Sequence, residues 1–218
     1  MRVSRTIVLV ALLLAGCVRQ ETAVAPEEGA TIPATSRPVE RVAARWDSDA
    51  RGAEWTMFVL AALDEVGGPL VVGTPTDMHW YCPKYPTAGR AERAAAWTGL
   101  ISMLALFESG FKPETSYRED FKDRNGNYVI SRGLLQLSIE SANGYGCGIH
   151  DANELHDPRT NLTCGVRILT RLVDRAGVVA TAQAPWRGAA AYWSPFRRAD
   201  RKAAMRDWLG RQSYCRLG

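Results

Sequence analysis

Glu108 is the residue of this chain that is best placed for acid–base chemistry. Trp97, Ile101 and Leu104 recur at spacings of four and three, which is the pattern of one apolar stripe on an α-helix. Glu108 takes the next place on that stripe, so its carboxyl group should meet apolar surroundings at the end of the helix. Desolvation and the negative end of the helix dipole both favour the protonated form there, which suits a general acid. The alternative is a frayed last turn that leaves Glu108 in water.

Two elements around Glu108 are expected to position it. The helix is predicted to begin at Thr87, which can cap it, and to stop after Glu108, because Gly110 can adopt the left-handed conformation that ends helices. A small β-hairpin should follow, since Asn125-Gly126 is a strong tight-turn signal and Tyr128-Val129-Ile130 has strand propensity.

The rest of the domain is predicted to be mainly helical. Ser48 and Asp49 can cap a first helix that ends at Gly67, whereas residues 70–86 contain three prolines and should be irregular. Asp157 can cap another helix, which has Pro158 at its first position. Further helices are expected to end near residue 144 and to cover about 186–193 and 199–211. Many helices with one hairpin indicate a mostly α domain of the α+β type.

The cysteines are expected to form disulfides. Once Cys17 is set aside for lipid attachment, four cysteines remain, and they allow three pairings. We favour Cys147 with Cys164, which are close in sequence, and hence Cys82 with Cys215. No Cys-x-x-Cys motif occurs and the three histidines show no ligand spacing, so the sequence predicts no metal site.

A secretion signal is expected at the start of the chain. Arg2 and Arg5 precede an apolar run over residues 7–14, which is far shorter than the roughly 20 residues of a membrane span. Leu14-Ala15-Gly16-Cys17 resembles a bacterial lipobox, which implies cleavage before Cys17 and acylation that holds the protein on a lipid bilayer. Val18 resembles the sorting signal for the outer membrane, which implies a position on its periplasmic side. The alternative is an ordinary signal peptide with an incidental cysteine.

The composition divides the chain into three parts. Residues 1–17 are the predicted lipoprotein signal peptide, and residues 18–45, with three prolines and few large apolar side chains, are predicted to be a disordered tether. Residues 46–218 suffice for one domain, and a hydrophobic share of 46% indicates a globular protein. The formal net charge of +4 falls to +2 without Arg2 and Arg5, which is too small to indicate nucleic-acid binding.

Several short motifs follow one another in a recognisable order after residue 87. In chain order they are Glu108-Ser109-Gly110-Phe111, the hairpin, Ser131, Gly133-Leu134-Leu135-Gln136-Leu137, Asn161-Leu162, Cys164-Gly165 and Ala191-Tyr192. Over about residues 87–196 this order resembles the SLT-type lytic transglycosylase domain of the lysozyme superfamily. The resemblance implies a lysozyme-like α+β fold. It also implies cleavage, without a cofactor, of the β-1,4 bond between N-acetylmuramic acid and N-acetylglucosamine in peptidoglycan.

The same resemblance implies roles for individual residues. Glu108 matches a single catalytic glutamate, which protonates the leaving oxygen and then takes a proton from the C6 hydroxyl so that a 1,6-anhydro ring closes. Ser131 matches a residue near the acetamido group of the substrate, and Gln136 matches one that lines the cleft. Tyr192 matches the tyrosine that hydrogen-bonds the catalytic carboxylate. The family usually has asparagine where this chain has Trp193, whose ring could instead stack on a sugar.

Other interpretations stay open. A hydrolytic muramidase needs a second carboxylate at about 5–5.5 Å or 6.5–9.5 Å from the first. The candidates in the hairpin region are Glu119, Asp120 and Asp123. A third interpretation is a catalytically inactive lipoprotein that binds the cell wall. For three of the site candidates the alternative is a structural role: Ser131 could end a strand, Gln136 could cap a turn and Tyr192 could belong to the core.

Overall fold

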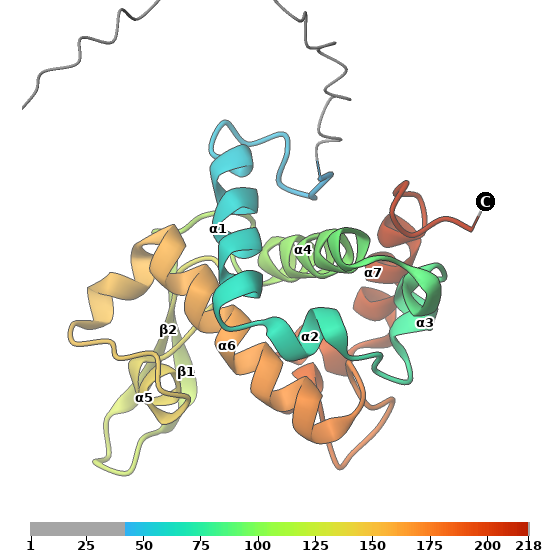
Figure 1. Ribbon diagram of the computed structural model, residues 1–218. Helices are drawn as coiled ribbons and strands as arrows, with labels where there is room; N and C mark the ends of the chain where they lie inside the picture. The colour runs from blue at the N-terminus through green and yellow to red at the C-terminus, as the bar shows by residue number, and fades with distance from the viewer. Residues whose placement is uncertain (1–41, 218) are drawn as a thin grey trace, which may run out of the picture. The chain divides into compact units, whose positions relative to one another are not determined.

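The computed structural model describes residues 42–217, and all statements on structure below concern these residues (Figure 1). The predicted signal peptide, Cys17 and all but the last residues of the predicted tether lie outside them. Within residues 42–217, no helix combines the length and the apolar character that crossing a bilayer requires.

Helices make up most of the domain, with one two-stranded sheet among the described residues. The α-helices are α1 (Gly52–Glu65), α2 (Gly68–Val72), α3 (Met78–Tyr81), α4 (Arg90–Glu108), α5 (Ile139–Gly144), α6 (Pro158–Ala176) and α7 (Ala199–Leu209). The 3-10 helices are η1 (Tyr85–Thr87), η2 (Ala152–His156), η3 (Ala189–Ala191) and η4 (Ser194–Arg197). The strands are β1 (Ser116–Lys122) and β2 (Tyr128–Arg132). The expectation of a mostly α, α+β domain is confirmed.

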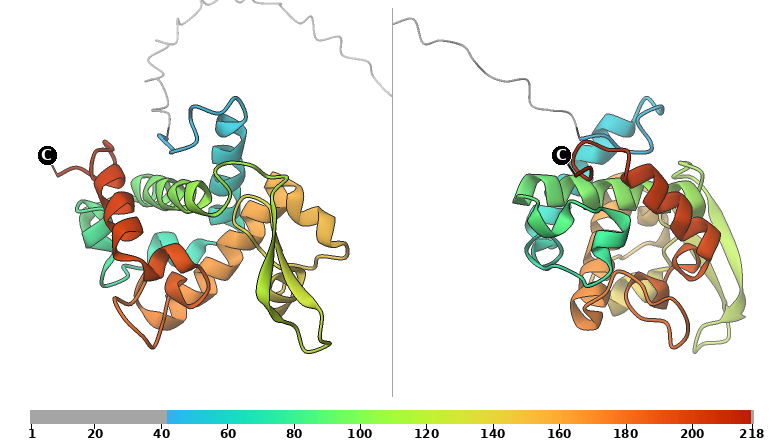
Figure 2. Two further views of the ribbon diagram at one scale, coloured as in Figure 1. Left: turned by 180° about the vertical axis from the view of Figure 1, so that it is seen from behind. Right: turned by 90° about the vertical axis from the view of Figure 1, so that its right-hand side faces the viewer.

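Helix α4 is the centre of the hydrophobic core. Every residue from Ala95 to Ala105 is buried, so the helix is covered on all sides rather than along one stripe. It packs against α1, α2 and α7, and Figure 2 shows it running between α1 and α7. The chain leaves this buried helix at Glu108, which therefore lies where the core meets the surface.

Helix α6 confirms the capping signals of the sequence. The Asp157 carboxylate accepts a hydrogen bond of 2.8 Å from the backbone N–H of Thr160, and Pro158 takes the first helical position. Gly177 ends the helix with a φ of +68°, the left-handed conformation that costs glycine little. The apolar face of α6 packs mainly against α1.

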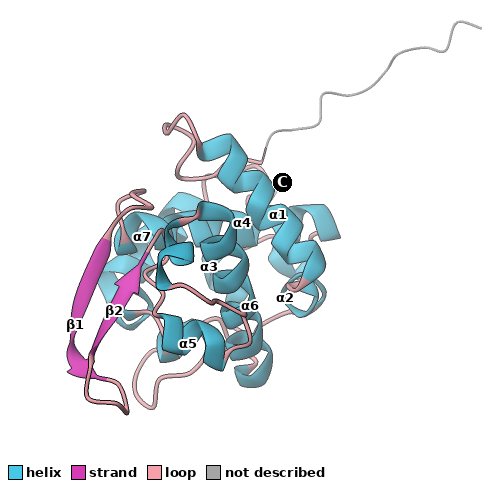
Figure 3. Ribbon diagram, turned by 90° about the vertical axis from the view of Figure 1, so that its left-hand side faces the viewer, coloured by secondary structure: helices cyan, strands magenta, loops and turns pink. Residues whose placement is uncertain are grey.

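The predicted hairpin is present and lies at one end of the domain, beside α5 (Figure 3). Strand β1 pairs antiparallel with β2, with Ser116 opposite Arg132 and Lys122 opposite Tyr128. The register shifts between Arg118 and Lys122, which marks a bulge in β1. Gly126, in the predicted turn, has a φ of +84°.

Both favoured disulfides are present. Cys82–Cys215 joins the end of α3 to the last residues of the domain, and Cys147–Cys164 joins the loop after α5 to α6.

Two helix caps were predicted wrongly. Asp49 does not cap α1, because its carboxylate binds the Arg51 backbone N–H at 2.9 Å and pairs with the Arg51 guanidinium, so the helix begins only after Arg51. Thr87 does not cap α4, because it lies within η1. Glu92 caps α4 instead, since its carboxylate accepts a hydrogen bond of 3.0 Å from the Gly89 backbone N–H.

Two segments also differ from the prediction. Residues 70–86 are not irregular, since the prolines there begin or separate the short elements α2, α3 and η1 instead of abolishing them. The predicted helix over 186–193 is absent, and this segment contains only the short 3-10 helix η3. Gly188 takes a φ of +61° against the backbone of Val179, where a Cβ would lie 2.3 Å from the carbonyl oxygen, and this conformation cannot belong to an α-helix.

Candidate active site

The end of α4 is fixed in place by the residues that follow Glu108. Ser109 Oγ donates a hydrogen bond of 3.0 Å to the Leu134 carbonyl, which ties the helix end to the Gly133–Leu137 motif. Gly110 and Phe111 then take φ values of +60° and +68°, so the chain turns sharply out of the helix as predicted. The backbone of Glu108 is therefore held by the buried helix α4 before it and by the Ser109–Leu134 hydrogen bond after it.

Glu108 lines a cavity of about 350 Å³ between the helix end, the hairpin and the chain around Tyr192. All five candidate catalytic and substrate-binding residues lie at its wall. The full lining is Glu108, Glu119, Phe121, Val129, Ser131, Gln136, Ser138, Ser141, Ala191, Tyr192, Trp193, Ser194 and Arg197. Residues more than 80 positions apart in the sequence thus meet at one site.

The surroundings of Glu108 favour its protonated form. The pKa of this carboxyl group is raised to about 7, mainly by burial and also by the negative charge of Glu119, while the Arg197 guanidinium opposes the shift. A carboxyl group with this pKa is half protonated at neutral pH, so it can give a proton and take one back. The predicted electrostatic state of Glu108 is confirmed. The main cause of the raised pKa is burial, and the helix dipole is not needed to explain the direction of the shift.

Glu119 is the second carboxylate of the cavity. It lies on β1 and accepts a hydrogen bond of 2.6 Å from Ser131 Oγ on the neighbouring strand. Of the three hairpin carboxylates considered from the sequence, Asp120 is exposed and Asp123 accepts hydrogen bonds from turn amides, including that of Asn125 at 2.9 Å. Neither of these two lines the cavity, whereas Glu119 does.

Gln136 is held rigidly at the cavity wall. Its backbone φ is +48°, an uncommon value for a residue other than glycine. Its Nε2 donates hydrogen bonds of 2.8 Å to the Gly133 carbonyl and 3.2 Å to the Thr115 carbonyl. The other amide atom, Oε1, is buried without a hydrogen-bond partner among the described residues. An acceptor left free in this way is suited to a donor from a bound ligand.

Asn161 positions the motif that carries Gln136. The Asn161 side chain is fully buried. Its Oδ1 accepts a hydrogen bond of 2.9 Å from the Leu135 backbone N–H, and its Nδ2 donates to the Arg132 and Leu155 carbonyls at 3.0 and 2.9 Å. One amide group thus ties together backbone groups of β2, of the Gly133–Leu137 motif and of η2.

Tyr192 and Trp193 both line the cavity and lie side by side, with ring centroids 4.7 Å apart. Burial raises the pKa of Tyr192 to about 12, and its hydroxyl interacts with Ser141 and the backbone of Ser138. No direct hydrogen bond joins Tyr192 to Glu108 in the part of the chain that the structure describes, so the proposed contact with the carboxylate stays a prediction.

Trp193 does not present a ring face to a sugar in this conformation. Its side chain is 2% exposed, and its Nε1 donates a hydrogen bond of 2.9 Å to the Leu135 carbonyl. The indole therefore supports the cavity wall from the core side, because a face that is packed against protein cannot stack on a ligand.

Several lining residues were not predicted from the sequence, and two of them, Phe121 and Arg197, have side chains that matter for the site. Phe121 on β1 is 56% exposed and offers an apolar surface at the cavity, and its place two residues after Glu119 could have revealed it. Arg197 on η4 binds the preceding segment of the backbone, since its Nε donates a hydrogen bond of 2.7 Å to the Ala190 carbonyl in η3. Arg197 is 89 positions from Glu108 in the sequence, and no motif around it indicated that it lies at the site. No cluster of three or more potential metal ligands exists among residues 42–217.

The fold and the site together define a lysozyme-like α+β protein with a glutamate at the end of its central helix. Residues 87–213 match the family described as Transglycosylase SLT domain. The chain belongs to this family of peptidoglycan lytic transglycosylases. The comparison with curated proteins finds no significant match.

Solved structures show the same fold. The structure described as Bd0314 DslA wild-type form 2 is 44% identical, has a TM-score of 0.77, and is matched over 81% of this chain and 99% of that one. Two variants of DslA, each with one glutamate replaced by glutamine, match over the same shares at 43% and 44% identity, with TM-scores of 0.77 and 0.76. The two replaced glutamates are eleven positions apart in DslA, which is also the spacing of Glu108 and Glu119 here.

Proposed function

We propose that this protein cleaves the β-1,4 bond between N-acetylmuramic acid and N-acetylglucosamine in peptidoglycan and leaves a 1,6-anhydromuramic acid end. The observation that carries the proposal is the position of Glu108, a carboxyl group with a pKa of about 7 at the wall of a cavity lined by the family motifs. Family membership supports the substrate class.

In the proposed reaction Glu108 acts first as an acid and then as a base. Its proton goes to the glycosidic oxygen as the bond from that oxygen to C1 of the muramic acid breaks, which makes the departing N-acetylglucosamine a neutral alcohol. The resulting carboxylate then takes the proton of the C6 hydroxyl while O6 bonds to C1. No water is consumed, and Glu108 ends the cycle protonated. Gln136 and Ser131 are proposed to bind the substrate from the cavity wall.

Hydrolysis is the second candidate, and Glu119 is the observation that favours it. A muramidase needs a second carboxylate to activate a water or to stabilise the positive charge that develops at C1. Glu119 lines the same cavity as Glu108 and is oriented by Ser131. The matching spacing of the two glutamates replaced in DslA supports a role for this pair.

Muropeptide analysis distinguishes the two reactions. Purified sacculi would be incubated with the wild-type protein and with Glu108→Gln, Glu119→Gln and the control Glu65→Gln, which changes an exposed residue of α1. Mass spectrometry of the products should show 1,6-anhydro ends with the wild type, Glu119→Gln and Glu65→Gln, and no release with Glu108→Gln. Reducing ends that disappear in Glu119→Gln would establish hydrolysis instead.

The inactive, wall-binding alternative makes a different prediction. If the protein only binds the wall, Glu108→Gln should change neither muropeptide release nor binding to sacculi. The proposed enzyme should lose release in this variant and keep sacculus binding, because glutamine retains the shape of the side chain.

We also propose that acylation of Cys17 anchors the protein to the periplasmic side of the outer membrane. The lipobox-like sequence before Cys17 and the peptidoglycan-directed family support this proposal. Cys17→Ser should move the protein from the membrane fraction to the soluble fraction of the cell. Unchanged fractionation of this variant would refute the anchor.

A further inference from the structure

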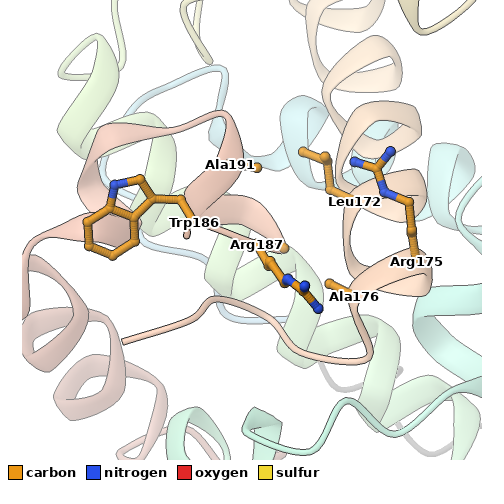
Figure 4. A pocket seen from close by; sticks show the side chains of 7 residues that line it. Leu172, Arg175, Ala176, Trp186, Arg187 and Ala191 are labelled. Atoms are coloured by element: carbon orange, nitrogen blue, oxygen red, sulfur yellow. The ribbon is translucent and has the colours of Figure 1, made fainter. Parts of the chain in front are cut away.

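A second cavity, of about 380 Å³, lies between the C-terminal part of α6 and the chain around Gly188 (Figure 4). It is lined by Leu172, Arg175, Ala176, Trp186, Arg187, Gly188 and Ala191. Figure 4 shows Arg187 extending toward Ala176 at the end of α6, while Arg175 lies beside Leu172 on the helix. The two guanidinium groups thus come from opposite sides of the cavity.

The charge of this cavity is unbalanced. Two arginines line it and no acidic side chain does. Within residues 42–217, neither Arg175 nor Arg187 forms an ion pair with a carboxylate. Two guanidinium groups around one cavity repel each other, and an anion between them removes this cost. Arginine is also the side chain best suited to bind a carboxylate through two parallel hydrogen bonds.

The backbone that carries Arg187 is fixed before any ligand binds. The Ala189 backbone N–H donates a hydrogen bond of 2.7 Å to the Val179 carbonyl, and Gly188 packs closely against the same residue. The Asp77 carboxylate in turn accepts hydrogen bonds of 2.6 and 3.0 Å from the backbone N–H groups of Val179 and Ala180. A fixed backbone lowers the ordering cost of binding.

The cavity adjoins the candidate active site, because Ala191 lines both. In peptidoglycan each muramic acid carries a stem peptide on its lactyl group, and that peptide has free carboxylates. We infer that Arg175 and Arg187 bind a stem-peptide carboxylate of a muramic acid residue held in the Glu108 cavity, so that strands bearing peptides are the preferred substrate. This inference rests on the proposed action on peptidoglycan.

Kinetics on two substrates test the inference. Glycan strands that keep their stem peptides are compared with strands from which an amidase has removed them. The protein is assayed as the wild type, as Arg175→Gln/Arg187→Gln, and as the control Arg211→Gln, which changes an exposed arginine that lines neither cavity. The double variant should raise KM for peptide-bearing strands about tenfold or more, since charge-assisted hydrogen bonds are lost, with kcat little changed. Peptide-free strands should be cleaved equally by all three.

Two outcomes would overturn the inference. One is an unchanged KM for peptide-bearing strands in the double variant. The other is an equal loss on both substrates, which would indicate a structural role for the two arginines. A wild-type protein that cleaves neither substrate would refute the proposed function instead. In that case calorimetry with the stem peptide released by the amidase still decides, since the wild type should bind this peptide and the double variant should bind it at least about tenfold more weakly.

Discussion

Replacing Glu108 by glutamine should abolish cleavage and at the same time stabilise the protein at alkaline pH. The folded protein holds the Glu108 proton more tightly than the unfolded chain does, since the pKa rises from 4.5 to about 7 on folding. The stability that this proton provides is complete below pH 4.5 and is lost as the pH rises through about 7. A glutamine at this position does not titrate, so it carries no such loss.

The size of the effect follows from the pKa. Each factor of ten in proton affinity is worth about 1.4 kcal/mol. The rise from 4.5 to about 7 therefore corresponds to about 3 kcal/mol of unfolding free energy. For a domain of this size, a difference of about 3 kcal/mol changes Tm by about 6–12 °C.

Urea unfolding followed by tryptophan fluorescence provides the assay. The wild type and Glu108→Gln should have similar unfolding free energies near pH 4, and the variant should exceed the wild type by about 3 kcal/mol near pH 9. Glu65→Gln serves as the matched control, because Glu65 is exposed on α1, and its difference from the wild type should not depend on pH between these limits.

A constant difference between the wild type and Glu108→Gln from pH 4 to pH 9 would refute this reasoning. It would mean that folding does not change the proton affinity of Glu108, and the argument for a buried general acid would lose its physical basis.

Three further results are expected. Glu119→Gln removes a charge that raises the pKa of Glu108, so the alkaline limb of the pH–rate profile should move to lower pH; an unmoved limb would contradict this electrostatic coupling. Asn161→Leu leaves two buried backbone groups, the Leu135 N–H and the Leu155 carbonyl, unpaired. It should lower the free energy of unfolding in urea by about 2 kcal/mol or more and remove most of the activity, whereas a loss below about 1 kcal/mol would show that the backbone rearranges to pair them. Removing the Cys82–Cys215 disulfide by a double serine substitution should lower the free energy of unfolding by about 5 kcal/mol, because the bridge closes a loop with a sequence separation of 133 and restricts the unfolded chain. Calorimetry that finds no fall in Tm would contradict this expectation.

Local patterns predicted the elements whose signals lie within a few residues. The Asp157 cap with Pro158 and the Asn125-Gly126 turn appear where the sequence placed them. Caps that depend on competition between neighbours were predicted less well. The Asp49 carboxylate binds the Arg51 backbone and side chain before α1 begins, and Thr87 lies in η1 while Glu92 binds the Gly89 N–H at the start of α4.

The predicted helix over 186–193 failed for a tertiary reason. Gly188 lies against the backbone of Val179, which is nine positions earlier, and this contact requires a conformation that no helix contains. Nothing in residues 186–193 alone reveals how close that backbone comes. Gly188 also lines the second cavity, which the sequence patterns did not predict either.

The sequence by itself determined the helix that ends at Glu108, the hairpin after it and the family, while it only favoured one of three disulfide pairings. The helix and the hairpin depend on periodicity and turn chemistry, which are properties of neighbouring residues, and the family depends on the order of motifs along the chain. Only the tertiary structure decided that Glu119, rather than Asp120 or Asp123, shares the cavity with Glu108, and that Trp193 faces the core. Both results depend on packing between segments that are far apart in the chain. This packing decides on which side of the bulged strand a carboxylate lies and whether an indole ring is buried, and no local pattern contains it.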